Sequence, residues 1–187
     1  MAVDLKLKHF LTTQNISFTH RKHPAVYTAQ EIAAAQHVSG KQLAKCVLVK
    51  TERGPHLAVL PAAQLIDLGK LKKVLKVKHL SIAREADIKA AFPDIETGAM
   101  SPFGNLYNVP TVVDARLAEC PEITCNAGSH TDTFTLHYRD FERVAKPKVG
   151  SFALEVAARR TPSKRPTAAK PKRRTTPTKK RPTRRKK

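Results

Sequence analysis

The strongest constraint on the fold is a break in composition near residue 158. From Arg159 to Lys187 the chain has fifteen Lys or Arg residues, five prolines, and no Asp, Glu, Leu, Ile, Val, Met or aromatic residue. Such a segment cannot bury enough apolar surface to offset the entropy cost of ordering it, and its charges repel one another. Its prolines also remove backbone donors and interrupt any helix. We therefore expect a folded domain over residues 1–152 and a disordered Lys/Arg/Pro-rich tail over residues 153–187.

Most of the positive charge lies in this tail. The 187-residue chain has a formal net charge of +20, and fifteen of these charges fall after residue 158, which leaves +5 for residues 1–158. A run this basic and this free of acid favours attraction to nucleic-acid phosphates with release of counterions, although a solvated tail that only aids solubility is the alternative. The tail residues expected to contact nucleic acid are Arg159, Arg160, Lys164, Arg165, Lys172, Arg173 and Arg174.

Other features argue against several protein classes. No apolar run approaches the roughly 20 residues needed to span a bilayer, and the N-terminus lacks the charged, apolar, small-residue order of a secretory signal. The three cysteines, Cys46, Cys120 and Cys125, are an odd number and do not suggest a disulfide framework. We expect a cytoplasmic protein without a membrane partner or a cofactor, and the sequence leaves its oligomeric state open.

Helix-like and strand-like segments alternate along residues 1–152. Thr28 followed by Glu31 is a capping box that begins an alanine-rich helix, and Asp67 can cap a helix that runs through Leu75. Apolar runs on both sides of residues 52–55 predict a hairpin of buried strands. These patterns predict an α/β (mixed) fold, a mixed β-sheet with helices packed on it. The other expected elements are a helix ending near Asn15, a helix at Arg84–Ala91, and strands at Ile16–His20, Val77–Ile82, Thr111–Val113, Glu122–Cys125 and Thr133–Tyr138.

Three short segments carry the residues that could do chemistry: Ala44-Lys45-Cys46, Thr97–Gly104 and Ala127–His130. The second is a loop by composition, because two glycines bracket a proline with small residues between them. Such a loop can bring backbone N–H groups close to a ligand, where they can stabilise an oxyanion, although an ordinary surface turn is the alternative. Met100 and Phe103 within it are expected to pack in the core.

In this order and at this spacing, the three segments resemble the YbaK/prolyl-tRNA-synthetase-associated family of free-standing editing deacylases, which hydrolyse mischarged aminoacyl-tRNA. The likeness runs from about Leu5 to Val149. It includes His23-Pro24-Ala25-Val26-Tyr27-Thr28 near its start and Asp140-Phe141-Glu142-Arg143 near its end. The resemblance implies a YbaK-like mixed β-sheet with packed helices.

Lys45 is the expected catalytic residue. It lies just before an apolar strand, where an ammonium group at a cleft mouth could hold a phosphate or stabilise negative charge on an ester oxygen. From position alone a solvated lysine would be the better interpretation, but Ala44-Lys45 matches the essential lysine of the family, which implies contact with the terminal adenosine and its phosphate. Cys46 has no neighbouring base and is not expected to be a nucleophile.

The resemblance also implies which residues line the substrate pocket. Gly98 and Pro102 match the Gly-x-x-x-Pro loop of the family, and Gly128-Ser129-His130 matches its Ala-Gly-Ser/Thr-His turn. A tight turn with a capping serine is the alternative for the latter, and near neighbours such as Ser129, His130 and Asp132 cannot line up as a catalytic relay. The predicted substrate-binding residues are Gly98, Ser101, Pro102, Gly104, Gly128, Ser129, His130 and His23.

A zinc site is the competing interpretation of Cys120, Cys125 and His130. Their spacing is not that of a usual zinc knuckle, and no fourth ligand is obvious. We therefore expect no metal.

The function that the resemblance implies is hydrolysis in trans of a mischarged tRNA, first of all Ala-tRNA-Pro, with serine or threonine as the next candidates for the removed amino acid. No covalent enzyme intermediate is implied, only positioning and electrostatic stabilisation. The expected partners are the aminoacylated 3′ end of tRNA and, through the tail, other nucleic acid. The alternative function is a non-catalytic nucleic-acid-binding protein with a histone-like basic tail on a deacylase-like body.

Overall fold

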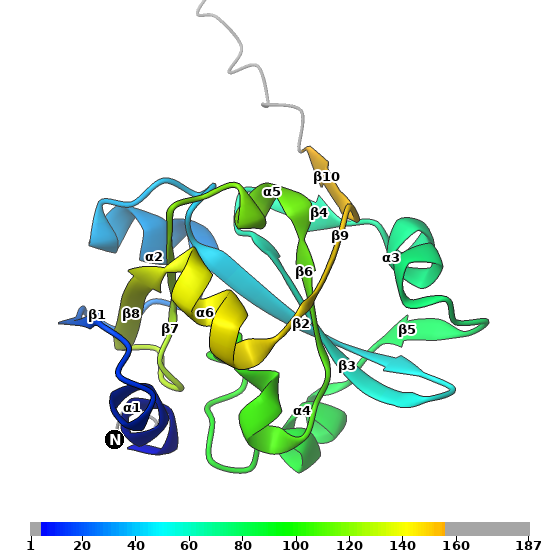
Figure 1. The fold of residues 1–187 in the computed structure, drawn as a ribbon, viewed down its shortest axis with the longest axis horizontal. Coiled ribbons are helices and arrows are strands. Elements are labelled where there is room, and N and C mark those ends of the chain that lie inside the picture. Colours follow the sequence, from blue (N-terminus) through cyan, green and yellow to red (C-terminus); the bar gives the residue numbers. More distant parts are fainter. Residues whose placement is uncertain (1–4, 156–187) are drawn as a thin grey trace, which may run out of the picture. The chain divides into compact units, whose positions relative to one another are not determined.

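The computed structural model describes residues 5–155, which form a single mixed α/β domain, as the sequence predicts (Figure 1). The elements, in chain order, are α1 (Leu5–Thr13), β1 (Phe18–Lys22), α2 (Ala29–Gln36), β2 (Ala44–Thr51), β3 (Gly54–Pro61), β4 (Gln64–Ile66), α3 (Leu68–Leu75), β5 (Leu80–Ile82), α4 (Glu85–Ala91), the 3-10 helix η1 (Gly104–Tyr107), β6 (Thr111–Asp114), α5 (Ala115–Ala118), β7 (Glu122–Asn126), β8 (Asp132–His137), α6 (Tyr138–Ala145), β9 (Lys148–Gly150) and β10 (Ala153–Glu155).

The strands of the described residues form three sheets rather than the one that the sequence predicts. The largest has the order β5-β2-β3-β6-β9 and is mixed, because β2 is antiparallel to β3 and β5 whereas β6 is parallel to β3 and β9. The second is antiparallel, with the order β1-β8-β7, and the third pairs β10 with β4. A parallel bridge between Leu43 and Thr124 places the start of β2 beside β7.

Side chains cap two helices where the sequence predicts them. Thr28 Oγ1 accepts from the amide of Glu31 at 3.2 Å, and the Glu31 carboxylate accepts from the amide of Thr28 at 3.0 Å. The Asp67 carboxylate accepts from the amide of Lys70 at 3.0 Å and so begins α3. Each bond satisfies an N–H group that has no partner within the helix. Both predicted helix starts are confirmed.

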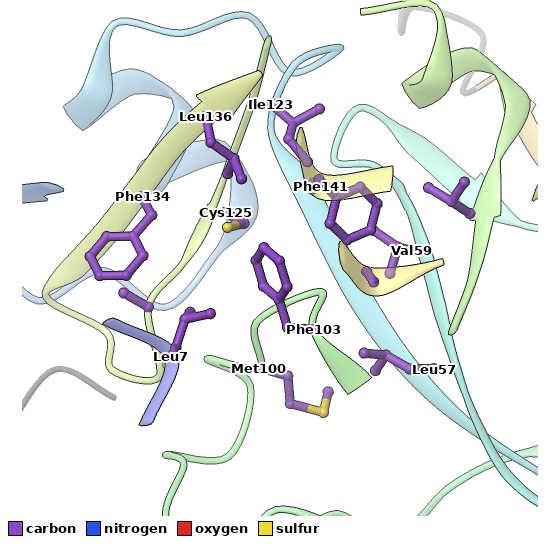
Figure 2. Close-up of a cluster of buried hydrophobic side chains, with 14 of the residues drawn as sticks. Leu7, Leu57, Val59, Met100, Phe103, Ile123, Cys125, Phe134, Leu136 and Phe141 are labelled. Carbon is purple, nitrogen blue, oxygen red and sulfur yellow. The ribbon is translucent and has the colours of Figure 1, made fainter. Parts of the chain in front are cut away.

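Aromatic side chains between the five-stranded and three-stranded sheets hold the 97–104 loop in place (Figure 2). Phe103 is fully buried, and its ring packs edge-on against Phe141 at 5.3 Å and Phe10 at 6.2 Å between ring centroids. Met100 is also buried, beside the same cluster. The prediction that Met100 and Phe103 pack in the core is confirmed, and this packing anchors one end of the loop.

Several segments differ from the predicted elements, and the pattern does not predict β4, η1, α5 or β9. The strand expected from residue 77 begins only at Leu80, because α3 ends with Lys76 in a left-handed conformation and Val77 packs inward. The strand expected through Tyr138 ends at His137, and a helix that the pattern does not predict, α6, follows directly. Strand β10 pairs with β4, so the folded domain extends at least three residues beyond the boundary predicted after residue 152.

The seven tail residues proposed for nucleic-acid contact, from Arg159 to Arg174, lie outside the described residues. Within residues 5–155, no helix has both the length and the apolar character that crossing a membrane would require.

Candidate functional site

The side chain of Lys45 is anchored at the start of β2. It is half-buried, and its Nζ donates to the backbone carbonyls of Ala62, at 3.4 Å in the turn after β3, and of Gln64, the first residue of β4. Burial lowers the pKa of Lys45 from its ordinary value. Because an ammonium group carries three N–H donors and two are used here, one remains to meet a ligand.

A small pocket opens beside this lysine. Its volume is about 60 Å³, which is small beside the roughly 300–1,000 Å³ of a typical small-molecule site. Lys45 and Gly98, predicted from separate motifs, both line it. Ile32 and Asn126 belong to no motif that would mark them as site residues from the sequence. The lining residues are Tyr27, Ile32, Leu43, Ala44, Lys45, Cys46, Gly98 and Asn126.

Gly98 has a conformation and a position that suit glycine. Its φ is +94°, in the region that side chains disfavour, and a Cβ placed on it would lie 3.4 Å from Cε1 of His130. Its carbonyl accepts from the Asn126 side chain at 3.5 Å. Within residues 5–155 its own N–H has no hydrogen-bond partner. Gly98 lines the pocket, and the role of its N–H as a donor to a ligand there stays a prediction.

The 127–130 turn is hydrogen-bonded to this loop. The amide of His130 donates to the Glu96 carboxylate at 2.9 Å, and its Nε2 lies 3.0 Å from the carbonyl of Thr97. The amide of Glu96 donates in turn to the carbonyl of Gly128 at 3.1 Å. The ring of Tyr27, from the pocket rim, lies 4.7 Å from the His130 ring between centroids. Two motifs about thirty residues apart in sequence are thus joined by hydrogen bonds, but Gly98 lines the pocket whereas Gly128 and His130 do not.

Ser129 is used inside the turn. Its hydroxyl donates to Asp132 at 2.8 Å, and the same carboxylate contacts Thr131 at 2.7 Å and Nε2 of His20 at 2.7 Å. Burial would raise the pKa of Asp132, but these hydrogen bonds outweigh it and lower the pKa. Ser129 does not line the pocket. Ser129 thus has the geometry of a serine that caps a tight turn. Its contact with substrate stays a prediction.

Three further residues predicted for substrate binding are buried in the loop away from the pocket lining: Ser101, Pro102 and Gly104. Gly104 has a steric role, because a Cβ there would lie 2.4 Å from the carbonyl oxygen of Val109. For these residues the geometry favours support of the loop, whereas contact with substrate stays a prediction.

His23 is also buried away from the pocket lining. Its amide donates to the carbonyl of Thr131 at 2.9 Å, and its Nδ1 lies 2.9 Å from the carbonyl of Pro24. The first contact joins the end of β1 to Thr131, which directly follows the 127–130 turn, and the second lies within the His23-Pro24 segment. This geometry is that of a residue that shapes the chain locally, and contact of His23 with substrate stays a prediction.

Burial disfavours the thiolate form of all three cysteines. Burial raises the pKa of Cys46 well above its ordinary value, and burial raises the pKa of Cys125 to about 12. In the described part of the chain, no three His, Cys, Asp or Glu side chains come together in a group that could hold a metal ion. A hollow of about 650 Å³ near the start of α6 is larger than the Lys45 pocket, but none of the predicted site residues lines it.

Comparisons with known proteins identify the family and the fold. Residues 23–144 match the family model of the aminoacyl-tRNA editing domain. A solved structure described as a candidate trans-editing enzyme for prolyl tRNA synthetase superposes with a TM-score of 0.72 at 20% identity, over 82% of this chain and 98% of that one. The hypothetical protein APE2540 gives a TM-score of 0.73 at 16% identity, over 80% and 99%. No curated protein sequence matches. Because the family model covers most of the chain, including Lys45, Gly98 and the 127–130 turn, the protein belongs to the aminoacyl-tRNA editing domain family.

Proposed function

We propose that this protein is an aminoacyl-tRNA deacylase that hydrolyses a mischarged tRNA in trans. The observation that carries the proposal is the half-buried ammonium group of Lys45 at a pocket of about 60 Å³, within a chain of the editing-domain family. The structural similarity to a candidate trans-editing enzyme for prolyl tRNA synthetase makes a mischarged tRNA-Pro the first substrate to test.

The reaction would depend on positioning and electrostatics. The free N–H of Lys45 would hold the terminal phosphate or the ester oxygen, and the unpartnered amide of Gly98 would stabilise negative charge on the carbonyl oxygen. The buried Oδ1 of Asn126, which has no partner among the described residues, offers an acceptor for the amino group of the substrate. A water molecule, assisted by a hydroxyl of the terminal ribose, would attack the ester carbonyl and release the free amino acid and the tRNA 3′ end, so no protein nucleophile is needed.

Selectivity would come from the size of the pocket. A volume of about 60 Å³, bounded by Ile32, Leu43 and Tyr27, suits a short side chain and excludes a long or aromatic one. Steric exclusion discriminates strongly against a larger amino acid, whereas one missing methylene costs only about 1–3 kcal/mol. Ala-tRNA-Pro is therefore the first candidate substrate, with seryl and threonyl esters next.

A panel of mischarged tRNAs tests the proposal. We expect the purified protein to deacylate alanyl esters at least about tenfold faster, in kcat/KM, than esters of amino acids with one or more extra carbon atoms, because one methylene is worth about 10–200-fold. The measurement is loss of radiolabelled amino acid from each tRNA over a buffer blank. Binding of all tRNAs without deacylation of any would instead support the non-catalytic nucleic-acid-binding alternative.

Deleting residues 159–187 should separate tRNA attraction from chemistry. The tail has fifteen positive charges and no acidic residue, so it should add affinity for any nucleic acid without base specificity. We expect the truncated protein to bind tRNA about tenfold or more weakly at low salt, with a flatter salt dependence, and to keep its turnover at saturating tRNA. Titrations and single-turnover rates at several salt concentrations check both halves. A truncated protein that is inactive at saturating tRNA would make the tail part of the active site.

A further inference from the structure

The outer surface of α3 is covered with lysine. Leu71 and Leu75 point into the core and hold the helix against the five-stranded sheet. The four lysines that start at residue 70 are all exposed. Positions 70, 72 and 73 project away from 71 and 75 at 3.6 residues per turn, and Lys76 follows directly at the C-terminal end of the helix. We call this surface the α3 lysine face: Lys70, Lys72, Lys73 and Lys76.

No carboxylate neutralises the α3 lysine face. Among residues 5–155, none of its lysines makes an ion pair. The two nearby acidic side chains are occupied by backbone amides: Asp67 caps Lys70, and Glu52 accepts from the amides of Lys78 and His79 at 2.8 and 3.0 Å. Because neither carboxylate forms an ion pair with these lysines, the four ammonium groups are available to an external partner.

The face lies close in sequence to the chain that anchors Lys45. The carbonyl of Gln64, at the start of β4, accepts from Lys45 Nζ, and α3 begins four residues further along the chain (Figure 1). An eight-residue helix is about 12 Å long. The segment that accepts a hydrogen bond from Lys45 is therefore followed, a few residues later in the chain, by the lysines of the α3 lysine face.

We propose that the α3 lysine face binds the phosphate backbone of the acceptor duplex of a tRNA whose aminoacylated 3′ end occupies the Lys45 pocket. The proposal rests on the proposed function. Lysine is a point-charge donor suited to phosphate, and double-stranded RNA is recognised mainly by shape and through its phosphates and hydroxyls. The helix LGKLKKVL has no aromatic side chain on which a base could stack, so binding would be independent of sequence. A uniformly cationic surface without apolar anchors also fits phosphates better than a protein partner.

The test uses the full chain with Lys70→Gln, Lys72→Gln and Lys73→Gln combined. Glutamine resembles lysine in helix propensity, so α3 should stay folded. A matched control, Lys8→Gln with Lys50→Gln and Lys89→Gln, removes the same charge from exposed positions on α1, β2 and α4. Two substrates are compared for each protein: whole mischarged tRNA, and the same amino acid esterified to a trinucleotide with the sequence of the tRNA 3′ end.

We expect the α3 variant to raise KM for whole tRNA about tenfold or more at ~0.1 M salt and to leave kcat unchanged. The slope of log affinity against log salt should fall by about two to three, one for each lost phosphate contact. The control should change KM less than about threefold, and hydrolysis of the trinucleotide ester, which has no duplex, should be the same for all three proteins. Thermal unfolding confirms that each variant folds.

The outcomes separate this proposal from the proposed function. Equal KM values and salt slopes for the α3 variant and the control on whole tRNA would overturn the docking surface, even if deacylation is normal. If the wild type hydrolyses no ester, the deacylase proposal fails, and the salt slopes of binding to whole tRNA and to the trinucleotide still decide the role of the face. If the α3 variant binds tRNA normally but loses binding to an acidic protein, the partner of the face is a protein and not RNA.

Discussion

Replacing Lys45 with alanine should lower kcat for the best mischarged tRNA at least about 100-fold, the loss expected when a preorganised electrostatic donor is removed. The fold should survive, because Lys45 is only half-buried and contributes charge rather than core volume. Loss of its hydrogen bonds to the carbonyls of Ala62 and Gln64 should cost about 1 kcal/mol, or about 2–4 °C in Tm. Single-turnover deacylation and thermal unfolding measure the two effects separately.

The control for this prediction is Lys50→Ala on the same strand. Lys50 is exposed and pairs with Asp87 at 2.9 Å, and such surface pairs contribute about 0–1 kcal/mol, so its loss should leave deacylation unchanged. Near-normal turnover by the Lys45→Ala variant would contradict the assignment of Lys45 as the catalytic residue. A Cys46→Ser or Cys120→Ser variant more damaging than Lys45→Ala would require a thiol or metal mechanism instead.

Gly98→Val should reduce kcat/KM about 100-fold, because a misplacement of about 1 Å in a site can cost that much. A branched side chain would be strained at a φ of +94°. Its Cβ would lie 3.4 Å from Cε1 of His130, and its methyl groups would crowd the small pocket that Gly98 lines. Pro102→Ala should reduce deacylation less, because Pro102 is buried away from the lining. Steady-state kinetics on one mischarged tRNA rank the variants.

Gly104→Ala provides the contrast within the same loop. Its Cβ would lie 2.4 Å from the backbone oxygen of Val109, and overpacking of this kind costs about 1–3 kcal/mol. We expect a lower free energy of unfolding with deacylation retained per folded molecule. Denaturant melts and active-site-normalised rates distinguish the two glycines. If Gly104→Ala kept its stability and lost activity, Gly104 would contact substrate, as the family resemblance implies.

The sequence by itself determined the features that depend on neighbours in the chain. The Thr28–Glu31 box, the Asp67 cap and the hairpin of β2 and β3 were all predictable, because their partners lie a few residues apart and the signal is local. The mixed α/β class also followed from the alternation of elements. Lys45, by contrast, was predicted only through the family resemblance, because a lysine before a strand is ordinarily a solvated residue.

Tertiary structure decided everything that depends on pairing across the chain. Apolar alternation indicates a strand but does not identify the strand that it pairs with. The structure therefore has three sheets where the sequence predicts one, and it contains β10, which pairs with β4 and has no signal in the sequence. The carbonyls that hold the Lys45 ammonium come 17 and 19 residues later in the chain. The packed chain brings Gly98 close to His130. In the 127–130 turn, the Ser129 hydroxyl donates to Asp132 and not to a ligand. Some of these contacts join residues far apart in sequence, and others depend on the direction in which a side chain points. Both are set only when the chain is packed.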